Sequence, residues 1–524
     1  MRKVSCFLYA VACAWGALGC GEGTLEAETE EMDSRSSEEF GLVSTAGAQA
    51  TPDTAYAGRN PTTIFHVAVG GNDNNPGTSA RPWRTLTKAV RTLTAGQGAY
   101  VHAGTYSEHV SITSRDGTAA APIFLMGAPG EAKPVIRATS AQPVVRISRA
   151  YWVVDGFDVN ANGQQAHGIR LQGARNVTVR NCLVHNGTGP GAIPVFEGAS
   201  DIWLYRNKVY DYRWYVNGRR QDSHGFFAVP DARRVLIQEN EAYNMSGDGF
   251  QCAGVSEVGF GTANPQDITL EDNRFHHNAE NAIDIKSCSR VTIRGGAKDG
   301  SKFFGHRPAD DTGTHCAGAA IVIHYNASQI LVERSRFWDN GIGVTVGRDD
   351  KQARDVIIRH NLFFGINTVK NGCGDGVRIA KVKNVSVYNN TFDGIGRSAV
   401  RVGVDNASTL SEGVGIWNNI MRNATHAVDV SFRFAPALKS DRNLVWGGNA
   451  AMRMNSKVLS LSAWKSQTGL DGSSQVADPK FVSDPASQDY YTQGGSPARD
   501  RAMALASSTY CGSGQDLGFL ESCE

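Results

Sequence analysis

Asp-Ile-Thr-Leu-Glu-Asp-Asn at residues 267–273 is one copy of a pattern that recurs along the chain: a short run of β-branched and aliphatic residues that closes on Asn. Clear copies end at residues 181, 207, 240, 273, 361, 390 and 419, and degenerate copies at 289–295 and 329–335 end in Gly and Ser. A repeat of roughly 20–40 residues is typical of a solenoid, in which each coil buries its apolar side chains against its neighbours. We expect the closing asparagines to hydrogen-bond from coil to coil.

A second repeating run precedes these copies. Its members are His-Gly-Ile-Arg-Leu-Gln (167–172), His-Gly-Phe-Phe-Ala-Val (224–229), Asp-Gly-Phe-Gln-Cys-Ala (248–253), Asn-Ala-Ile-Asp-Ile-Lys (281–286), Ala-Ala-Ile-Val-Ile-His (319–324), Ile-Gly-Val-Thr-Val-Gly (342–347), Asp-Gly-Val-Arg-Ile-Ala (375–380), Ser-Ala-Val-Arg-Val-Gly (398–403) and His-Ala-Val-Asp-Val-Ser (426–431). Positions three and five are apolar in almost every copy. Because side chains alternate along a strand, these positions should point inward and positions four and six outward.

Both ends of the chain fit this organisation. Val-Ala-Val-Gly-Gly-Asn-Asp-Asn-Asn-Pro-Gly-Thr (67–78) and an amphipathic helix at 83–93 precede the repeats, and Ala-Asp-Pro-Lys-Phe (477–481) follows them. Together, these features resemble the pectate-lyase-like right-handed parallel β-helices. The resemblance implies one all-β solenoid domain over 63–524, with an N-terminal cap (63–110), main coils (145–435) and a C-terminal closing segment (436–524).

The first 62 residues are expected to lie outside this domain. Arg2 and Lys3 precede an apolar stretch that ends Ala-Leu-Gly-Cys at 17–20, which resembles a bacterial lipoprotein signal with Cys20 as the acylated residue. The alternative is an ordinary secretory peptide cleaved nearby. Residues 21–62 are rich in Glu and poor in large apolar groups, so they are expected to form a disordered tether. We therefore expect export to the bacterial cell envelope and a membrane link only through lipid.

The charge balance and the cysteines indicate which binding partners and which disulfide bonds to expect. Residues 1–40 hold three of the 52 basic and eight of the 51 acidic residues, so the rest of the chain carries a net charge of +6. This balance does not suggest a nucleic-acid partner, and we expect a monomer. An exported chain can oxidise its cysteines, and the pairs suggested by the sequence are Cys511 with Cys523 and, more weakly, Cys288 with Cys316.

One group of outward-facing candidates is acidic. Asp248, Glu280 and Asp284 come from adjacent coils, and carboxylate oxygens are the ligands that Ca²⁺ prefers. The run Glu280-Asn281-Ala-Ile-Asp284 resembles a substituted form of the calcium-binding Asp-Asp-x-x-Asp run of family-nine polysaccharide lyases. The resemblance implies bound calcium, whereas the alternative is a solvated turn and an ion pair between Asp284 and Lys286.

The other group is basic and polar. Arg170, Lys286, Arg348, Arg378 and Arg401 are predicted on one face, where arginine can bind carboxylates in a bidentate manner. His224 and Gln251 join Arg170, Arg378 and Arg401 as expected substrate-binding residues. A basic stripe beside a small acidic group indicates an acidic polysaccharide as partner, and the alternative is an ordinary solvated sheet face.

These two groups lead to a functional hypothesis, which is an exported polysaccharide lyase that cleaves a uronate-containing glycan by β-elimination. Lys286 is the expected base, with Arg348 assisting at the catalytic centre. The family-nine lysine aligns one coil further on, with His324, which makes His324 the second candidate, and histidine is suited to proton transfer near neutral pH. A glycoside hydrolase that uses paired carboxylates, an epimerase and a non-catalytic glycan-binding β-helix remain the alternatives.

Overall fold

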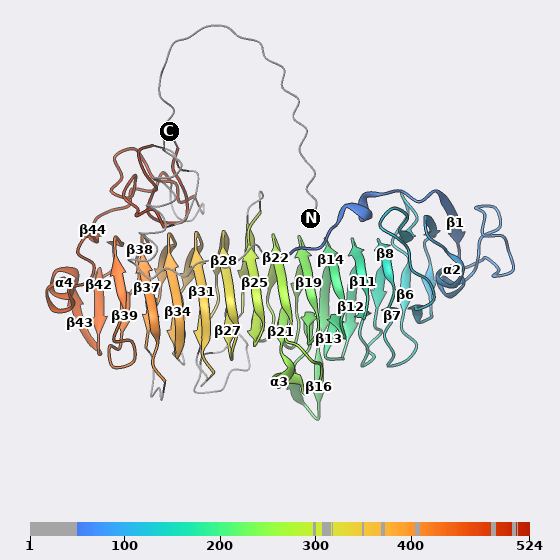
Figure 1. Ribbon diagram of the computed structural model, residues 1–524, viewed down its shortest axis with the longest axis horizontal. Coiled ribbons are helices and arrows are strands. Elements are labelled where there is room, and N and C mark those ends of the chain that lie inside the picture. Colours follow the sequence, from blue (N-terminus) through green and yellow to red (C-terminus); the bar gives the residue numbers. More distant parts are fainter. Residues whose placement is uncertain are drawn as a thin grey trace, which may run out of the picture.

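The chain folds into a long solenoid of stacked coils (Figure 1). The structure is a computed structural model that describes residues 50–296, 300–306, 316, 318–347, 351–367, 372–403, 409–483, 489–505, 510 and 512–523. Each coil contributes one strand to each of three sheets, and each sheet has fourteen strands within the described residues. The predicted parallel β-helix is confirmed.

Sheet I contains the first repeating run of the sequence. In spatial order its strands are β1 (Thr63–Val67), β2 (Gln97–Val101), β5 (Ile123–Gly127), β8 (Ala150–Asp155), β11 (Arg175–Arg180), β14 (Ser200–Tyr205), β19 (Arg233–Gln238), β22 (Gln266–Glu271), β25 (Ser289–Arg294), β28 (Ser328–Glu333), β31 (Ala353–Arg359), β34 (Val382–Tyr388), β37 (Glu412–Trp417) and β40 (Lys439–Asp441).

Sheet II contains the second repeating run. Its strands are β4 (Val110–Ile112), β7 (Val145–Ile147), β10 (Ile169–Gln172), β13 (Gly191–Phe196), β18 (His224–Ala228), β21 (Phe250–Ala253), β24 (Ile283–Lys286), β27 (Ala319–His324), β30 (Ile342–Gly347), β33 (Val377–Ala380), β36 (Ser398–Val402), β39 (His426–Val430), β42 (Ala451–Met454) and β43 (Lys457–Ser460). Among the described strands of this sheet, only the terminal pair β42–β43 is antiparallel.

Sheet III was not anticipated from the sequence. Its strands are β3 (Thr105–Tyr106), β6 (Val135–Arg137), β9 (Asp158–Asn160), β12 (Leu183–Gly187), β15 (Lys208–Tyr212), β20 (Glu241–Tyr243), β23 (Arg274–His276), β26 (Ser301–Phe304), β29 (Ser335–Trp338), β32 (Leu362–Ile366), β35 (Thr391–Ile395), β38 (Ile420–Arg422), β41 (Leu444–Trp446) and β44 (Gln475–Val476). The coils therefore extend on both sides of the range 145–435 that the repeat defined.

The inward and outward positions of sheet II follow the predicted alternation. Ile283 and Ile285 of β24 are fully buried in the core, whereas Asp284 and Lys286 lie on the outer face. Direct pairing stacks Asp284 between Gln251 of β21 and Val322 of β27. The outer face of sheet II thus carries ladders of side chains in register, and successive members of a ladder lie about 4.8 Å apart.

A column of buried asparagines closes the turn after sheet I, as predicted. The backbone N–H of Asn361 donates to Asn390 Oδ1 at 3.0 Å, and Asn390 repeats this contact with Asn419 at 3.0 Å. Two predicted members are displaced. The backbone N–H of Cys182, rather than of Asn181, donates to Asn207 Oδ1, and Ser301, rather than Gly295, accepts from the backbone N–H of Asn273.

The outer face of sheet III carries a continuous stack of rings. The stacked residues are His185, Tyr210, Tyr243, His276, Phe304, Trp338 and Phe364, with successive ring centroids 4.2–5.4 Å apart. Because the ring faces contact one another along the solenoid axis, only the ring edges are turned to the outside. This arrangement stabilises the register of the coils.

The N-terminal part differs from the predicted tether. Residues 50–62 are described, and within them the 3-10 helix η1 (Ala55–Gly58) packs Tyr56 against sheet I, where its hydroxyl lies 2.9 Å from that of Thr178. The tether boundary at residue 62 is therefore too late, because the buried aromatic ring of Tyr56 fixes this segment. The signal peptide, Cys20 and residues 21–49 lie outside the described residues.

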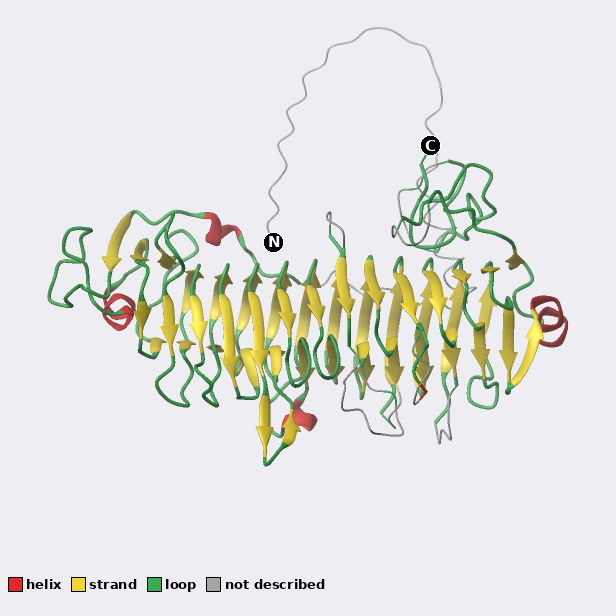
Figure 2. Cartoon of the chain, turned by 180° about the vertical axis from the view of Figure 1, so that it is seen from behind, coloured by secondary structure: helices red, strands yellow, loops and turns green. Residues whose placement is uncertain are grey.

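Short helices cover the two ends of the solenoid (Figure 2). The predicted helix at 83–93 is α2 (Leu86–Thr92), capped by the Thr85 side chain. Helix α4 (Leu461–Thr468) closes the other end, and α3 (Val255–Val258) lies in a loop beside the antiparallel hairpin β16 (Trp214–Val216)–β17 (Arg219–Gln221). In the described part of the chain, no helix has the length and apolar character needed to cross a membrane.

The disulfides differ from the suggested pairing. Cys252 pairs with Cys288 and Cys316 with Cys373, so the Cys288–Cys316 pair is wrong. The spacing of cysteines in sequence could not reveal this, because neighbouring coils bring distant residues together. Cys511 lies outside the described residues.

Candidate active site

The candidate site lies on the outer face of sheet II, across β18, β21, β24 and β27. These four strands are consecutive neighbours in the sheet. The hairpin β16–β17 projects from the coil just before β18 (Figure 1), and Arg220 of β17 lies 3.8 Å from Glu280. The site therefore combines a rigid sheet with one inserted element.

Asp248 forms the buried floor of this site. Its side chain is fully buried, and Oδ1 accepts hydrogen bonds from the backbone N–H of Asn281 at 3.0 Å and from the Asn281 side chain at 2.9 Å. Oδ2 lies 3.2 Å from His224 Nδ1 and accepts from Gln251 at 3.3 Å. His224 and Gln251 are themselves buried, at 4% and 6% exposure, so they support Asp248 and are not placed to contact a glycan.

Asp284 joins the two predicted catalytic residues. Its Oδ2 lies 3.0 Å from Lys286 Nζ, and its Oδ1 lies 2.8 Å from His324 Nε2. Lys286 and His324 are direct neighbours on adjacent strands. Their side chains are 23% and 19% exposed, against 7% for Asp284, so a buried carboxylate holds two accessible nitrogen groups.

The electrostatics of this group disfavour Lys286 as a base. Burial would lower the pKa of the Lys286 ammonium, but the charge and hydrogen bond of Asp284 outweigh burial and raise this pKa above its usual value. Burial likewise acts to raise the pKa of Asp284, but His324 and Lys286 outweigh it and hold this pKa below its usual value. Lys286 therefore remains a cation at neutral pH. It is better suited to neutralising a substrate carboxylate than to removing a proton.

Glu280, unlike Asp284, has a pKa above its usual value. Burial and the nearby carboxylates of Asp248 and Asp222 raise the pKa of Glu280 to about 9, although Arg220 acts against this. Arg220 Nη2 lies 3.8 Å from Glu280 Oε1. A glutamic acid that keeps its proton at neutral pH beside an ionised Asp284 is the arrangement expected of a general acid.

Arg220 and Asp222 were not predicted from the sequence. They lie in the hairpin insertion between sheet III and sheet II, outside both repeating runs, so their position relative to β24 depends on the hairpin geometry. The signal that could have drawn attention to them is the length of the insertion at 211–223, which interrupts an otherwise regular coil.

Calcium does not fit the described arrangement of the predicted ligands. Both oxygens of Asp248 and both oxygens of Asp284 already meet polar or cationic partners. Lys286 and Arg220 supply positive charge among these carboxylates, and no three acidic, histidine or cysteine side chains within the described ranges are placed to hold a metal ion. We therefore derive no chemical step through a metal.

The predicted basic stripe is divided into separate ion pairs. Arg170 lies 3.8 Å from Glu197 and over the ring of Phe196, three coils before Gln251. On the other side, Arg378 and Arg401 occupy the third and fourth coils beyond Asp284.

The basic residues beyond the catalytic coils also meet carboxylates. Arg378 contacts Asp375 at 2.6 Å, and Arg401 contacts Asp429 at 3.2 Å. Arg348 lies outside the described residues. The structure thus brings Asp248, Glu280, Asp284, Lys286 and His324 together, and places Arg170, Arg378 and Arg401 at a distance on either side.

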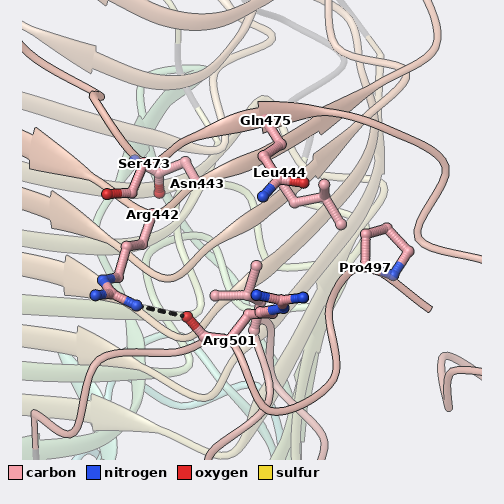
Figure 3. Close-up of a pocket in the computed structure, with 8 residues that line it drawn as sticks. Arg442, Asn443, Leu444, Ser473, Gln475, Pro497 and Arg501 are labelled. Atoms are coloured by element: carbon pink, nitrogen blue, oxygen red, sulfur yellow. Dashed lines mark hydrogen bonds between the residues drawn. The ribbon is translucent and has the colours of Figure 1, made fainter. Parts of the chain in front are cut away.

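A separate cavity of about 120 Å³ lies near the C-terminal end of the solenoid. It is lined by Arg442, Asn443, Leu444, Ser473, Gln475, Pro497, Arg501 and Leu517, and Arg442 donates to the carbonyl oxygen of Arg501 at 3.2 Å (Figure 3). Its lining contains no carboxyl or imidazole group for acid–base chemistry, so it is not the candidate active site.

Comparison with known proteins agrees with the fold. Residues 65–260 match the family model described as "Pel9A-like, right handed beta helix region". This match confirms the predicted resemblance to the pectate-lyase-like β-helices and the right-handed fold. No curated protein matches the chain.

Solved structures with similar folds act on different glycans. Pectate lyase Pel9A is 16% identical, with a TM-score of 0.47, and the match covers 90% of this chain and 100% of that one. A rhamnogalacturonan lyase is 16% identical, with a TM-score of 0.42 and coverage of 81% and 92%. The catalytic domain of a GH87 α-1,3-glucanase is 13% identical, with a TM-score of 0.49 and coverage of 76% and 70%. Similarity at this level does not assign an activity to this chain.

Proposed function

We propose that this protein is a polysaccharide lyase that cleaves a uronate-containing glycan by β-elimination. The observation that carries the proposal is the set of three accessible groups around buried Asp284 and Asp248: a persistent ammonium (Lys286), a carboxyl group with a raised pKa (Glu280) and an imidazole (His324). β-Elimination needs a cation for the substrate carboxylate, a base for the adjacent carbon and an acid for the leaving oxygen.

Each group has a distinct role in this proposal. His324 removes the proton α to the uronate carboxylate, and the hydrogen bond between its Nε2 and Asp284 holds the imidazole ring in place. Lys286 binds the carboxylate and stabilises the negative charge that develops on it. Glu280 donates its proton to the leaving glycosidic oxygen as the C–O bond breaks and the ring double bond forms.

The roles of Lys286 and His324 can be separated by substitution. Absorbance of the unsaturated uronate product is followed on polygalacturonate, alginate and chondroitin. We expect His324→Ala to lower kcat by roughly 10²–10⁴-fold, the usual contribution of a positioned base. Lys286→Arg should retain more activity than Lys286→Ala, because a permanent cation can neutralise a carboxylate but cannot act as a base.

The experiment also includes a control variant and a comparison of activity with and without calcium. Arg206→Gln removes an exposed ion pair to Glu239 on another face and should leave the rate unchanged. The calcium prediction is tested in the same assay, with EDTA and with added calcium. Full activity of Lys286→Ala and His324→Ala together would refute the assigned mechanism.

A glycoside hydrolase is the second candidate function. Glu280 as acid and Asp284 as ionised carboxylate have pKa values shifted in opposite directions, and such pairs are also used in glycoside hydrolysis. A hydrolase would release new reducing ends without the absorbance of an unsaturated product, so the same assay separates the two reactions.

We further propose export, with acylation at Cys20. The disulfides Cys252–Cys288 and Cys316–Cys373 support an oxidising compartment. Metabolic labelling with a fatty-acid analogue in a bacterial host tests this idea. We expect label on the wild-type chain and none on Cys20→Ser, whereas equal labelling of both would contradict the anchor.

A further inference from the structure

A cluster of four arginines lies on the outer face of sheet II, beyond the candidate active site. Its members are Arg378 of β33, Arg397 in the turn before β36, Arg401 of β36 and Arg453 of β42. Asp284, Val322, Thr345 and Arg378 are successive register partners, so the cluster begins about 14 Å from Asp284, three strand spacings along the axis. An oligosaccharide of several units that follows the axis would reach it.

Two buried carboxylates fix the arginines from below. Asp375 is fully buried, and its Oδ2 accepts from Nε and Nη2 of Arg378 at 2.8 and 2.6 Å. Asp429 is 6% exposed and lies 3.2 Å from Arg401 and 3.0 Å from Arg453. Arg378 therefore rests on Asp375, and Arg453 rests on Asp429.

The arginines keep donors for a ligand. Several of their N–H groups make no hydrogen bond within the described residues: Nη1 of Arg378, and Nε and Nη2 of Arg397 and Arg453. The side chains of Arg378 and Arg453 are also 18% and 27% exposed. A guanidinium group held on one edge and open on the other presents donors in fixed geometry, which suits a planar or tetrahedral oxyanion.

The same cluster contains unsatisfied buried polar atoms. Asp375 Oδ1 and His426 Nδ1 have no hydrogen-bond partner in the part of the chain that the structure describes. Because buried polar groups in native proteins are almost always paired, such atoms concentrate where water or a ligand completes the network. Two of them beside four arginines distinguish this region from an ordinary charged surface.

We propose that Arg378, Arg397, Arg401 and Arg453 form a distal subsite that binds an anionic group of the glycan, several sugar units away from the cleaved bond. The proposal rests on the proposed function, since it takes the glycan to follow the axis from Glu280 and Lys286. Uronate carboxylates and sulfate esters share the required chemistry. The subsite would make cleavage depend on a charged unit remote from the reacting one.

Affinity electrophoresis of the full chain tests the subsite. Each protein carries His324→Ala, so that bound polymer is not cleaved, and the gels contain polygalacturonate, dextran sulfate or neutral dextran. We expect retardation by polygalacturonate and none by dextran. Arg397→Gln and Arg453→Gln should each weaken binding about tenfold, the effect of losing one charge-assisted contact. Arg397→Lys should recover part of the loss.

Arg206→Gln is the matched control, because it removes one arginine of an exposed ion pair far from sheet II. Equal binding by the His324→Ala parent and by correctly folded Arg397→Gln and Arg453→Gln made in it would overturn the proposal, as would no binding of either anionic polymer by that parent. If binding of dextran sulfate depends on the arginines and binding of polygalacturonate does not, the subsite is assigned to sulfate esters. If binding depends on the arginines but the wild-type chain cleaves none of the polymers, the lyase proposal is refuted and the subsite proposal stands. If the wild-type chain cleaves the polymer but the arginine variants bind it as well as their parent does, the subsite proposal is refuted and the lyase proposal stands.

Discussion

Asn390→Ala should destabilise the solenoid strongly, because Asn390 is a fully buried member of the asparagine column. Its Nδ2 donates to the carbonyl of Ile358 at 2.9 Å, to that of Tyr388 at 3.0 Å and to Asn419 Oδ1 at 3.1 Å. Its Oδ1 accepts from the backbone and side-chain N–H groups of Asn361 at 3.0 and 3.1 Å. Alanine leaves the Asn361 N–H and the Ile358 carbonyl buried without these partners. At about 1–3 kcal/mol for each orphaned group, we expect the free energy of unfolding to fall by about 3–5 kcal/mol.

Urea denaturation followed by tryptophan fluorescence measures this loss. Trp417 is buried and pairs with Tyr388 in the neighbouring strand, so it reports on the coil concerned. Asn449→Ala is the control, since Asn449 is exposed, and it should change stability by less than about 0.5 kcal/mol. Asn390→Ser should recover part of the loss, because Ser301 fills the same column position and accepts from Asn273 through its hydroxyl. A cost for Asn390→Ala no larger than that of Asn449→Ala would refute the reasoning.

Three further predictions concern the site and the N-terminal segment. Asp284→Asn should lower kcat/KM by about 10²-fold, because two charge-assisted contacts, to His324 and Lys286, are weakened together; wild-type kinetics in this variant would show that Asp284 does not position them. Glu280 has a folded-state pKa raised to about 9, so between its unfolded pKa and about pH 9 the folded state binds more protons and stability falls as pH rises. Glu280→Gln should therefore gain melting temperature relative to wild type, and the gap should widen from pH ~5 to pH ~9; a gap independent of pH would contradict the assigned shift. Tyr56→Ala should release residues 50–62 from sheet I and hasten proteolysis there, whereas unchanged cleavage would mean that this ring does not hold the segment.

The sequence was sufficient to predict sheets I and II because their strands alternate over five or six residues and recur in register. Sheet III escaped prediction although its signal is present. Several strands of this sheet, such as Glu241–Tyr243 and Arg274–His276, are three-residue runs that end on an aromatic ring. Runs of three residues are too short to show alternation on their own, and only the stacking of coils makes the rings neighbours.

The sequence was sufficient to predict which residues form the candidate site, but not the chemical role of each residue. Asp248, Glu280, Asp284, Lys286 and His324 could be placed together because their strands are consecutive. The sequence could not show that Asp284 contacts both Lys286 and His324, and this contact moves the expected base from Lys286 to His324. Nor could it show that His224 and Gln251 are covered, since their exposure depends on the packing of inserted loops.

The measurement that tests the central claim most directly is the mass of the products formed in water enriched with heavy oxygen. Elimination breaks the glycosidic C–O bond without adding water, whereas hydrolysis adds one oxygen from solvent to the product. With an acidic polymer that the enzyme cleaves, we predict unsaturated fragments that carry no oxygen from solvent in the wild type and their loss in His324→Ala. Saturated fragments labelled with heavy oxygen would contradict the lyase and assign Glu280 and Asp284 to hydrolysis.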